Sequence, residues 1–310
     1  MNPEVGVETN PNVVRKKQKQ KQARTILLFV LPGLLVYSVF ILYPILATFN
    51  YSFFNFSGGQ SQRTFVGLSN YTTLFADQTF WQALKNNSFI ILVSVFVQIP
   101  LGLMMALVLF SPIKGVKLLN VLYFLPYLMS TVAIGLLWIF MFDPMNGPVN
   151  QVVKLFGQNP IPWLADKNTA MIAVLLVIVW QFAPFYMILF KAAMVGIPDE
   201  LYEAARIDGA NGTQQFFYIT FPSLIPTIVT SSILAVVGSL KQFDIFYIMT
   251  GGGPGNSTEI LGTYMFKQGF INFNMGYAST IAAMMFILAF IAVLIIQFIE
   301  YQRKKRGIMI

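Results

Sequence analysis

Residues that could carry out catalysis are scarce in this sequence. Its 310 residues include no cysteine and no histidine, which excludes disulfides, thiolate or imidazole metal sites, and nucleophilic chemistry on either side chain. The glycine-rich run 251–255 is not followed by Lys-Ser or Lys-Thr, so it is not a phosphate-binding loop, and we interpret it as a tight turn. The sequence therefore predicts no catalytic residue and no metal site in this chain.

Polar side chains that could bind a solute stand inside two long apolar stretches, 169–190 and 223–249. A polar group in a membrane helix normally faces protein or a water-lined path rather than lipid. With one aromatic ring added, the candidates for lining such a path are Gln181, Phe185, Ser239 and Gln242. The alternative for the glutamines and the serine is hydrogen bonding between helices. Lys241 and Asp244, three residues apart, would share a helix face, either beside the path or as an interfacial ion pair.

The loop 195–222 carries the strongest local signals for structure. Pro198 suits a first helical turn, and Asp199 and Glu200 suit its positive end. Gly209 then breaks the pattern, which predicts a helix of about three turns. Asn211 with Gln214 forms a plausible capping box for a second short helix.

One side of that first helix is suited to close contact. Leu201, Ala204, Ala205 and Asp208 share it by their spacing, and small residues beside a carboxylate can enter a groove that offers a basic group. The alternative is an ordinary amphipathic connector that lies on the membrane surface.

Composition identifies the solvent of the chain as lipid. Hydrophobic residues make up 56% and charged residues only 10%, against about 25% charged in soluble domains. A bilayer core takes about 20 apolar residues in a helix. Six stretches qualify and predict an all-α polytopic membrane protein with six transmembrane helices: 26–49, 88–110, 118–142, 169–190, 223–249 and 277–299.

Basic residues predict the orientation of these spans. With an inside N-terminus, 14 of the 20 Lys and Arg residues fall on the inside, so both termini are expected in the cytoplasm. The net charge of +8 comes largely from two terminal segments, a basic N-terminal segment 1–25 and a basic tail 301–310. We interpret these as contacts with anionic lipid and not with nucleic acid.

The loop also matches a known signature. Glu203-Ala204-Ala205, three residues, Gly209, nine residues, Ile219, one residue and Phe221-Pro222 resemble the pattern E-A-A-x3-G-x9-I-x-L-P of ABC importer permeases, with Phe221 in place of Leu. Segments 66–71, 180–185 and 250–254 look like the carbohydrate-uptake branch, of the maltose-permease type. The resemblance covers about residues 26–300, without the extra N-terminal spans and large external domain of the maltose protein.

That resemblance implies a type I ABC importer permease fold over 26–300. The residues contacting a cytoplasmic ATPase would be Glu203, Ala204, Ala205 and Gly209. Implied partners are a second homologous permease subunit, a dimer of ATPase subunits that bind ATP and Mg²⁺, and an extracellular or periplasmic solute-binding protein. This chain would bind no cofactor, lie in the bacterial cell (inner) membrane, and pass a sugar or oligosaccharide along the path named above.

Three other functions are alternatives to this one. Glycerol phosphate or another small polar solute is the main alternative cargo, although a phosphate site would recruit several Arg residues and the spans contain none. An ion-coupled secondary transporter would need charges within the spans, where Lys241 and Asp244 alone qualify. An intramembrane enzyme would need a catalytic site, and the apolar segments of this chain lack the residues to form one.

Overall fold

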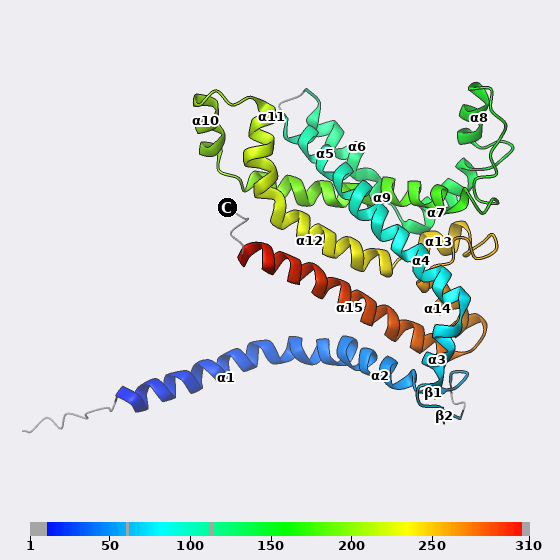
Figure 1. Ribbon diagram of the computed structural model, residues 1–310. Coiled ribbons are helices and arrows are strands. Elements are labelled where there is room, and N and C mark those ends of the chain that lie inside the picture. The colour runs from blue at the N-terminus through cyan, green and yellow to red at the C-terminus, as the bar shows by residue number, and fades with distance from the viewer. Residues whose placement is uncertain (1–10, 60–61, 112–113, 306–310) are drawn as a thin grey trace, which may run out of the picture.

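The computed structural model describes residues 11–59, 62–111 and 114–305, and these residues are mainly helical (Figure 1). The long helical segments begin with α1 (Pro11–Tyr37), η1 (Ser38–Leu42), α2 (Tyr43–Tyr51), α4 (Gln78–Val93), η2 (Ser94–Gln98), α5 (Ile99–Phe110), α6 (Val116–Leu128) and α7 (Thr131–Met141). They continue with α9 (Ala170–Val195), α11 (Gly212–Gln215), η3 (Phe216–Thr220), α12 (Phe221–Leu240) and α15 (Met275–Lys305).

Shorter elements join the long helices. They are β1 (Phe54–Asn55), β2 (Thr64–Phe65), α3 (Ser69–Ala76), α8 (Pro148–Leu155), α10 (Asp199–Ile207), α13 (Asp244–Met249), α14 (Leu261–Phe266) and η4 (Lys267–Ile271). The two strands pair antiparallel, with Phe54 opposite Phe65. The segments labelled η are single π-helical turns.

Helices long and apolar enough to span a membrane number five in the described residues, or six when a bent pair counts as one span. The bent pair, α6 and α7, corrects the expectation of one continuous helix over 118–142, because the two halves meet at 97°. Met129 and Ser130 between them are extended, with ψ of 149° and 129°, and extended residues interrupt the helical hydrogen bonds.

The fifth span also differs from its predicted range. Its helix begins at Gly212 rather than 223, and α12 ends at Leu240 rather than continuing to 249. Residues 241–243 leave the helix before α13 begins, so Lys241 and Asp244 do not share a helix face. The expectation that these two residues share a helix face is therefore wrong, and no ion pair joins them within the described residues.

The boundaries of the terminal segments also shift. Helix α1 begins at Pro11, inside the basic segment 1–25, and α15 runs through Lys305. Residues 1–10 and 306–310 of the two predicted basic segments lie outside the described residues.

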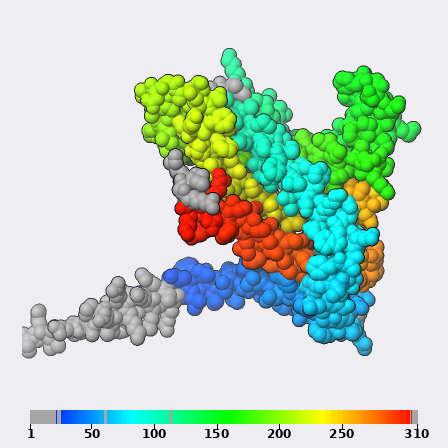
Figure 2. Space-filling model, viewed as in Figure 1, coloured from blue at the N-terminus to red at the C-terminus, as the bar shows by residue number. Residues whose placement is uncertain are grey.

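Figure 1 shows the two ends of the bundle. The start of α1, the end of α15 and the short helix α10 lie at one end, and β1, β2, α3, α8 and α13 lie at the other. Helix α1 stands apart from the remaining helices (Figure 2). The N-terminal helical segment contacts the rest of the bundle mainly through α2, which packs against α15. Within the span Thr25–Tyr51 the most apolar window is wholly unburied in the isolated chain.

Proline explains three of the π-helical turns. Segments η1, η2 and η3 each end two residues before a proline, namely Pro44, Pro100 and Pro222. A proline lacks an amide hydrogen and its ring clashes with the carbonyl four residues earlier, so the preceding turn widens. Each of these widened turns therefore interrupts the regular α-helix of one span, at a position that the proline sets.

The core centres on the pair α5 and α9. Gly102 permits this contact, because a Cβ there would lie 2.6 Å from Cβ of Tyr186 and 2.9 Å from the backbone nitrogen of Met187. Small residues let membrane helices approach closely. The two spans therefore form a fixed wall against which α12 packs.

Candidate functional site

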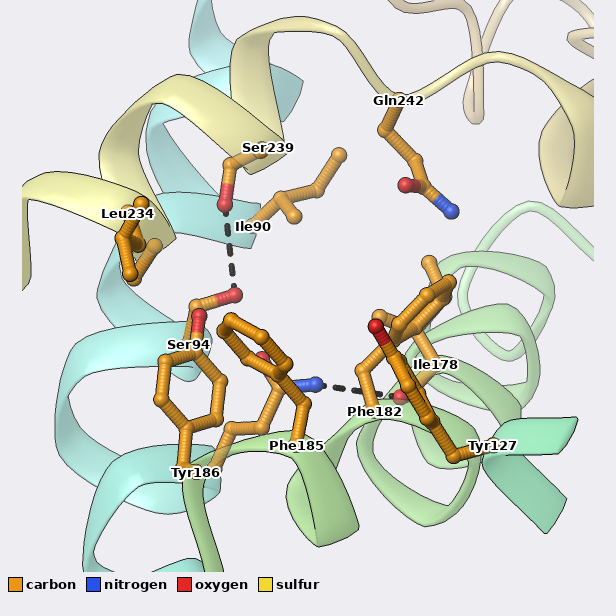
Figure 3. Close-up of a pocket in the computed structure, with 13 residues that line it drawn as sticks. Ile90, Ser94, Tyr127, Ile178, Phe182, Phe185, Tyr186, Leu234, Ser239 and Gln242 are labelled. Atoms are coloured by element: carbon orange, nitrogen blue, oxygen red, sulfur yellow. Dashed lines mark hydrogen bonds between the residues drawn. The ribbon is translucent and has the colours of Figure 1, made fainter. Parts of the chain in front are cut away.

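A cavity of about 180 Å³ opens near the middle of α9, between that helix, η2, α6 and α12 (Figure 3). It is lined by Ile90, Ser94, Gln98, Tyr127, Ile178, Phe182, Phe185, Tyr186, Leu234, Ala235, Gly238, Ser239 and Gln242. The lining side chains are apolar, aromatic or neutral polar, and none of them carries a charge. Such a site can accept a neutral solute with hydrogen-bonding groups.

Three of the four predicted pathway residues meet here. Phe185, Ser239 and Gln242 line the cavity. Gln181 does not, because its side chain is 1% exposed and its Nε2 donates to Oγ1 of Thr131 on α7 at 3.4 Å. The Oε1 of Gln181 has no hydrogen-bond partner among the described residues. Gln181 therefore forms a hydrogen bond between two helices, which was the alternative to lining the path.

Other polar lining residues were not singled out from the sequence. Ser94 and Gln98 come from η2, where Ser239 Oγ donates to Ser94 Oγ at 3.2 Å and Gln98 Nε2 donates to the backbone oxygen of Ile178 at 3.1 Å. Both stand in the apolar stretch 88–110, so the rule applied to the fourth and fifth spans would have found them there.

Aromatic rings form one side of the cavity. The rings of Tyr127 and Phe185 are stacked with centroids 5.7 Å apart, and Phe182 meets Tyr127 edge-on at 6.2 Å. In Figure 3 these rings lie across the cavity from Ser239 and Gln242. A flat apolar face opposite hydroxyl and amide groups matches a ring-shaped solute that carries hydroxyls on its rim.

The second predicted site is the helix α10 at the end of the bundle where the described chain begins and ends (Figure 1). Asp199 and Glu200 occupy its first turn. Gly209, with φ of +81°, follows its end, where an L-residue with a side chain would be strained. The predicted capping box is confirmed, since Gln214 N donates to Asn211 Oδ1 at 2.9 Å and Asn211 N donates to Gln214 Oε1 at 2.8 Å.

Much of the surface of α10 is left exposed by the described residues. Glu203, Ala204 and Gly209 are exposed and Ala205 is half-buried. Glu203 forms no ion pair within the described residues, and a Cβ on Gly209 would meet nothing within 4 Å. Ile207 is 87% exposed.

Hydrogen bonds at the opposite end fix the loops next to the cavity. Asn86 Nδ2 donates to the backbone oxygens of Ser257 (3.0 Å) and Glu259 (2.7 Å). Glu259, 1% exposed, accepts from Lys267 Nζ at 2.5 Å. The segment after α12 is therefore tied both to α4 and to η4.

Asp77 anchors the same end. Its Oδ2 accepts hydrogen bonds from the hydroxyls of Tyr264 and Tyr277, and its Oδ1 accepts from the backbone nitrogen of Thr79 at 2.8 Å. Burial alone would raise the pKa of Asp77, but these donors outweigh burial and hold it below the ordinary value of 3.8. Burial, and then the bond to Asp77, raise the pKa of Tyr264 to about 12.

Comparisons with known proteins agree on one family. Residues 98–305 match the model described as "Binding-protein-dependent transport system inner membrane component". The "Probable ABC transporter permease protein YurN" of Bacillus subtilis is 38% identical, over 84% of this chain and 90% of its own length. The "Trehalose/maltose transport system permease protein MalF" of Thermococcus litoralis is 32% identical, over 90% of this chain and 95% of its own.

A solved structure shares the fold. It is a chain of a bacterial alginate ABC transporter in complex with an alginate pentasaccharide-bound periplasmic protein. The TM-score is 0.79 at 21% identity, covering 90% of this chain and 94% of that one.

Proposed function

The chain belongs to the inner membrane components of binding-protein-dependent transport systems, and from this membership we propose that it is the permease subunit that passes a sugar or oligosaccharide across the bacterial cell membrane. It is a transport subunit and not an enzyme. The observation that carries the choice of cargo is the uncharged cavity with stacked aromatic rings on one side.

The chemistry of the cavity supports a neutral sugar over glycerol phosphate. Phe185 and Tyr127 offer apolar ring faces, and Ser94, Gln98 and Gln242 offer hydroxyl and amide groups. A phosphate would call for Arg or Lys, and none lies among the described residues that line the cavity. The trehalose/maltose relative supports the same class of cargo.

The size of the cavity supports a second permease subunit. Sites for small ligands commonly enclose about 300–1,000 Å³. The cavity in this chain holds about 180 Å³, so it forms one wall of a larger chamber. A homologous but distinct permease would supply the facing wall.

The helix α10 is the proposed contact with a cytoplasmic ATPase. Glu203, Ala204, Ala205 and Gly209 would enter a cleft of that subunit, with Glu203 paired to a basic group and Gly209 leaving room for the approach. ATP and Mg²⁺ would be bound and ATP hydrolysed there. The end that bears α10 and both ends of the described chain would then face the cytoplasm, and the end with α3, α8 and α13 would receive a solute-binding protein.

The mechanism is alternating access. Closure of the two ATPase subunits would draw α10 toward its counterpart on the second permease, and α12 would follow and open the cavity outward. The binding protein would release its sugar into the chamber while the cytoplasmic side is closed. Reopening of the ATPases would turn the cavity inward.

Uptake into vesicles tests this function. The chain would be purified with the subunits that copurify with it and reconstituted with ATP inside, using labelled trehalose, maltose and lactose as probes. We expect uptake of at least one probe that needs ATP and the binding protein and withstands ionophores. Uptake that is independent of ATP and depends on a proton or sodium gradient would instead establish a secondary transporter.

A further inference from the structure

One side-chain hydrogen bond joins α10 directly to the span that lines the cavity. The hydroxyl of Tyr202, on α10, lies 2.9 Å from Oγ1 of Thr220. Thr220 is the last residue of η3, is 7% exposed and immediately precedes α12. The far end of α12 carries Leu234, Ala235, Gly238 and Ser239 of the cavity wall.

The route along the backbone between these two residues contains three flexible features. Gly209 has a left-handed conformation, residues 210–211 are non-helical, and η3 is a π-helical turn widened ahead of Pro222. A displacement of α10 passing along that route would be absorbed by changes in these backbone angles.

A second polar contact does not span the whole bend, that is, the segment from Gly209 to the end of η3. Gln215 Nε2 donates to the backbone oxygen of Ala210 at 3.1 Å, so it joins the loop to α11, on the near side of η3. The bond between Tyr202 and Thr220 reaches the α12 side of the bend. It therefore links α10 to the rigid part of the fifth span.

We propose that Tyr202 is the positioning residue through which movement of α10 is transmitted to α12 and the cavity wall. This inference rests on the proposed docking of α10 to an ATPase. The hydroxyl of Tyr202 is the group that matters, because it makes the hydrogen bond to Thr220. Thr220 is its partner on the α12 side and contributes its Oγ1 to the bond.

The absence of cysteine from the chain permits a clean spectroscopic test. Nitroxide labels would be attached at Leu176→Cys on α9 and Thr230→Cys on α12, both exposed positions that do not line the cavity. Distances between the labels would be measured by pulsed electron resonance in the complete complex, with its binding protein, in nanodiscs. The two states compared are nucleotide-free and trapped with ATP, Mg²⁺ and vanadate.

We expect trapping to shift the distance in the labelled parent. Tyr202→Phe and Thr220→Val should each lower the ratio of shifted to unshifted complexes about fivefold, the effect of one lost hydrogen bond. The double variant should fall no further than either single one, because both remove the same contact. Thr220→Ser, which keeps the hydroxyl, should respond like the parent.

Matched controls lie in the same segment. Tyr218→Phe changes an 80% exposed tyrosine of η3, and Thr213→Val changes an exposed threonine of α11. Both should respond like the parent, and all variants should copurify with the ATPase. A parent response that Tyr202→Phe retains, or additive losses in the double variant, would overturn the role of Tyr202 alone. A parent with no response to vanadate would overturn the proposed function as well.

Discussion

Asn87 holds Ser239 in place at the cavity wall. The amide nitrogen of Asn87 donates to the backbone oxygen of Ser239 at 2.8 Å, and the amide oxygen accepts from the backbone nitrogen of Leu261 at 2.8 Å. Through these two bonds one side chain joins α4 to the end of α12 and to the start of α14. Asn87 is fully buried. It is the partner of the backbone nitrogen of Leu261 at the start of α14, and it gives the backbone oxygen of Ser239 a shorter hydrogen bond than the 3.4 Å one from the backbone nitrogen of Gln242.

Replacement of Asn87 by leucine should destabilise the chain. The backbone nitrogen of Leu261, left without its partner, should cost about 1–3 kcal/mol of folding free energy. The expected readout is a lower melting temperature of the purified chain in detergent. Ser88→Ala, at the neighbouring exposed position on the same helix, is the control and should melt like the parent. An unchanged melting temperature for Asn87→Leu would contradict the bridging role.

Changes in the ATPase-docking surface should reduce transport without loss of the protein from the membrane. Glu203→Ala removes the proposed charged hydrogen bond and should lower uptake about tenfold or more. Gly209→Ala forces a side chain onto a φ of +81°, at a cost of about 1–2 kcal/mol. Uptake and ATPase copurification would be measured beside the amount of chain in the membrane. Glu200→Gln, one turn earlier, should be neutral, and normal uptake by both test variants would rule out the docking role.

Cavity variants should separate lining residues from packing residues. Phe185→Leu removes ring stacking and Gln242→Leu removes an amide, so each should raise the KM for the transported sugar by about two- to tenfold. Gln181→Leu, outside the lining, should leave KM unchanged and alter the melting temperature. A KM raised only by Gln181→Leu would reverse this assignment.

Acid should weaken the end of the bundle that Asp77 anchors. The pKa of Asp77 is lowered in the folded chain, so its contribution to stability is present above the ordinary pKa of 3.8 and is lost as the pH falls through the folded value. We expect the melting temperature to fall as the pH is lowered below the ordinary value of 3.8 toward the lower pKa of the folded chain. Asp77→Asn should flatten that dependence, and an Asp77→Asn chain as acid-sensitive as the parent would show that other carboxylates are responsible. Tyr264, with its pKa of about 12, stays a donor throughout.

The sequence by itself determined the lipid solvent, the number of apolar stretches, the family and the form of α10. These are local properties, because apolar length, a proline before a helix, Gly209 after it and the pair Asn211 and Gln214 act on neighbouring residues. They need no knowledge of which helix packs against which. The contact of Glu203 and its neighbours with an ATPase stays a prediction.

Only the tertiary structure decided what surrounds the cavity. Ser94, Tyr127, Phe185 and Ser239 lie on four different spans, and helical periodicity predicts a face but not the neighbour that meets it. Because periodicity does not predict the neighbouring helix, the sequence did not reveal that Gln181 bonds to Thr131. It also did not reveal that α12 ends just before Lys241, so that Lys241 and Asp244 do not share a helix face. Packing, in particular the close crossing at Gly102, set which side chains meet, because it depends on residues far apart in the chain.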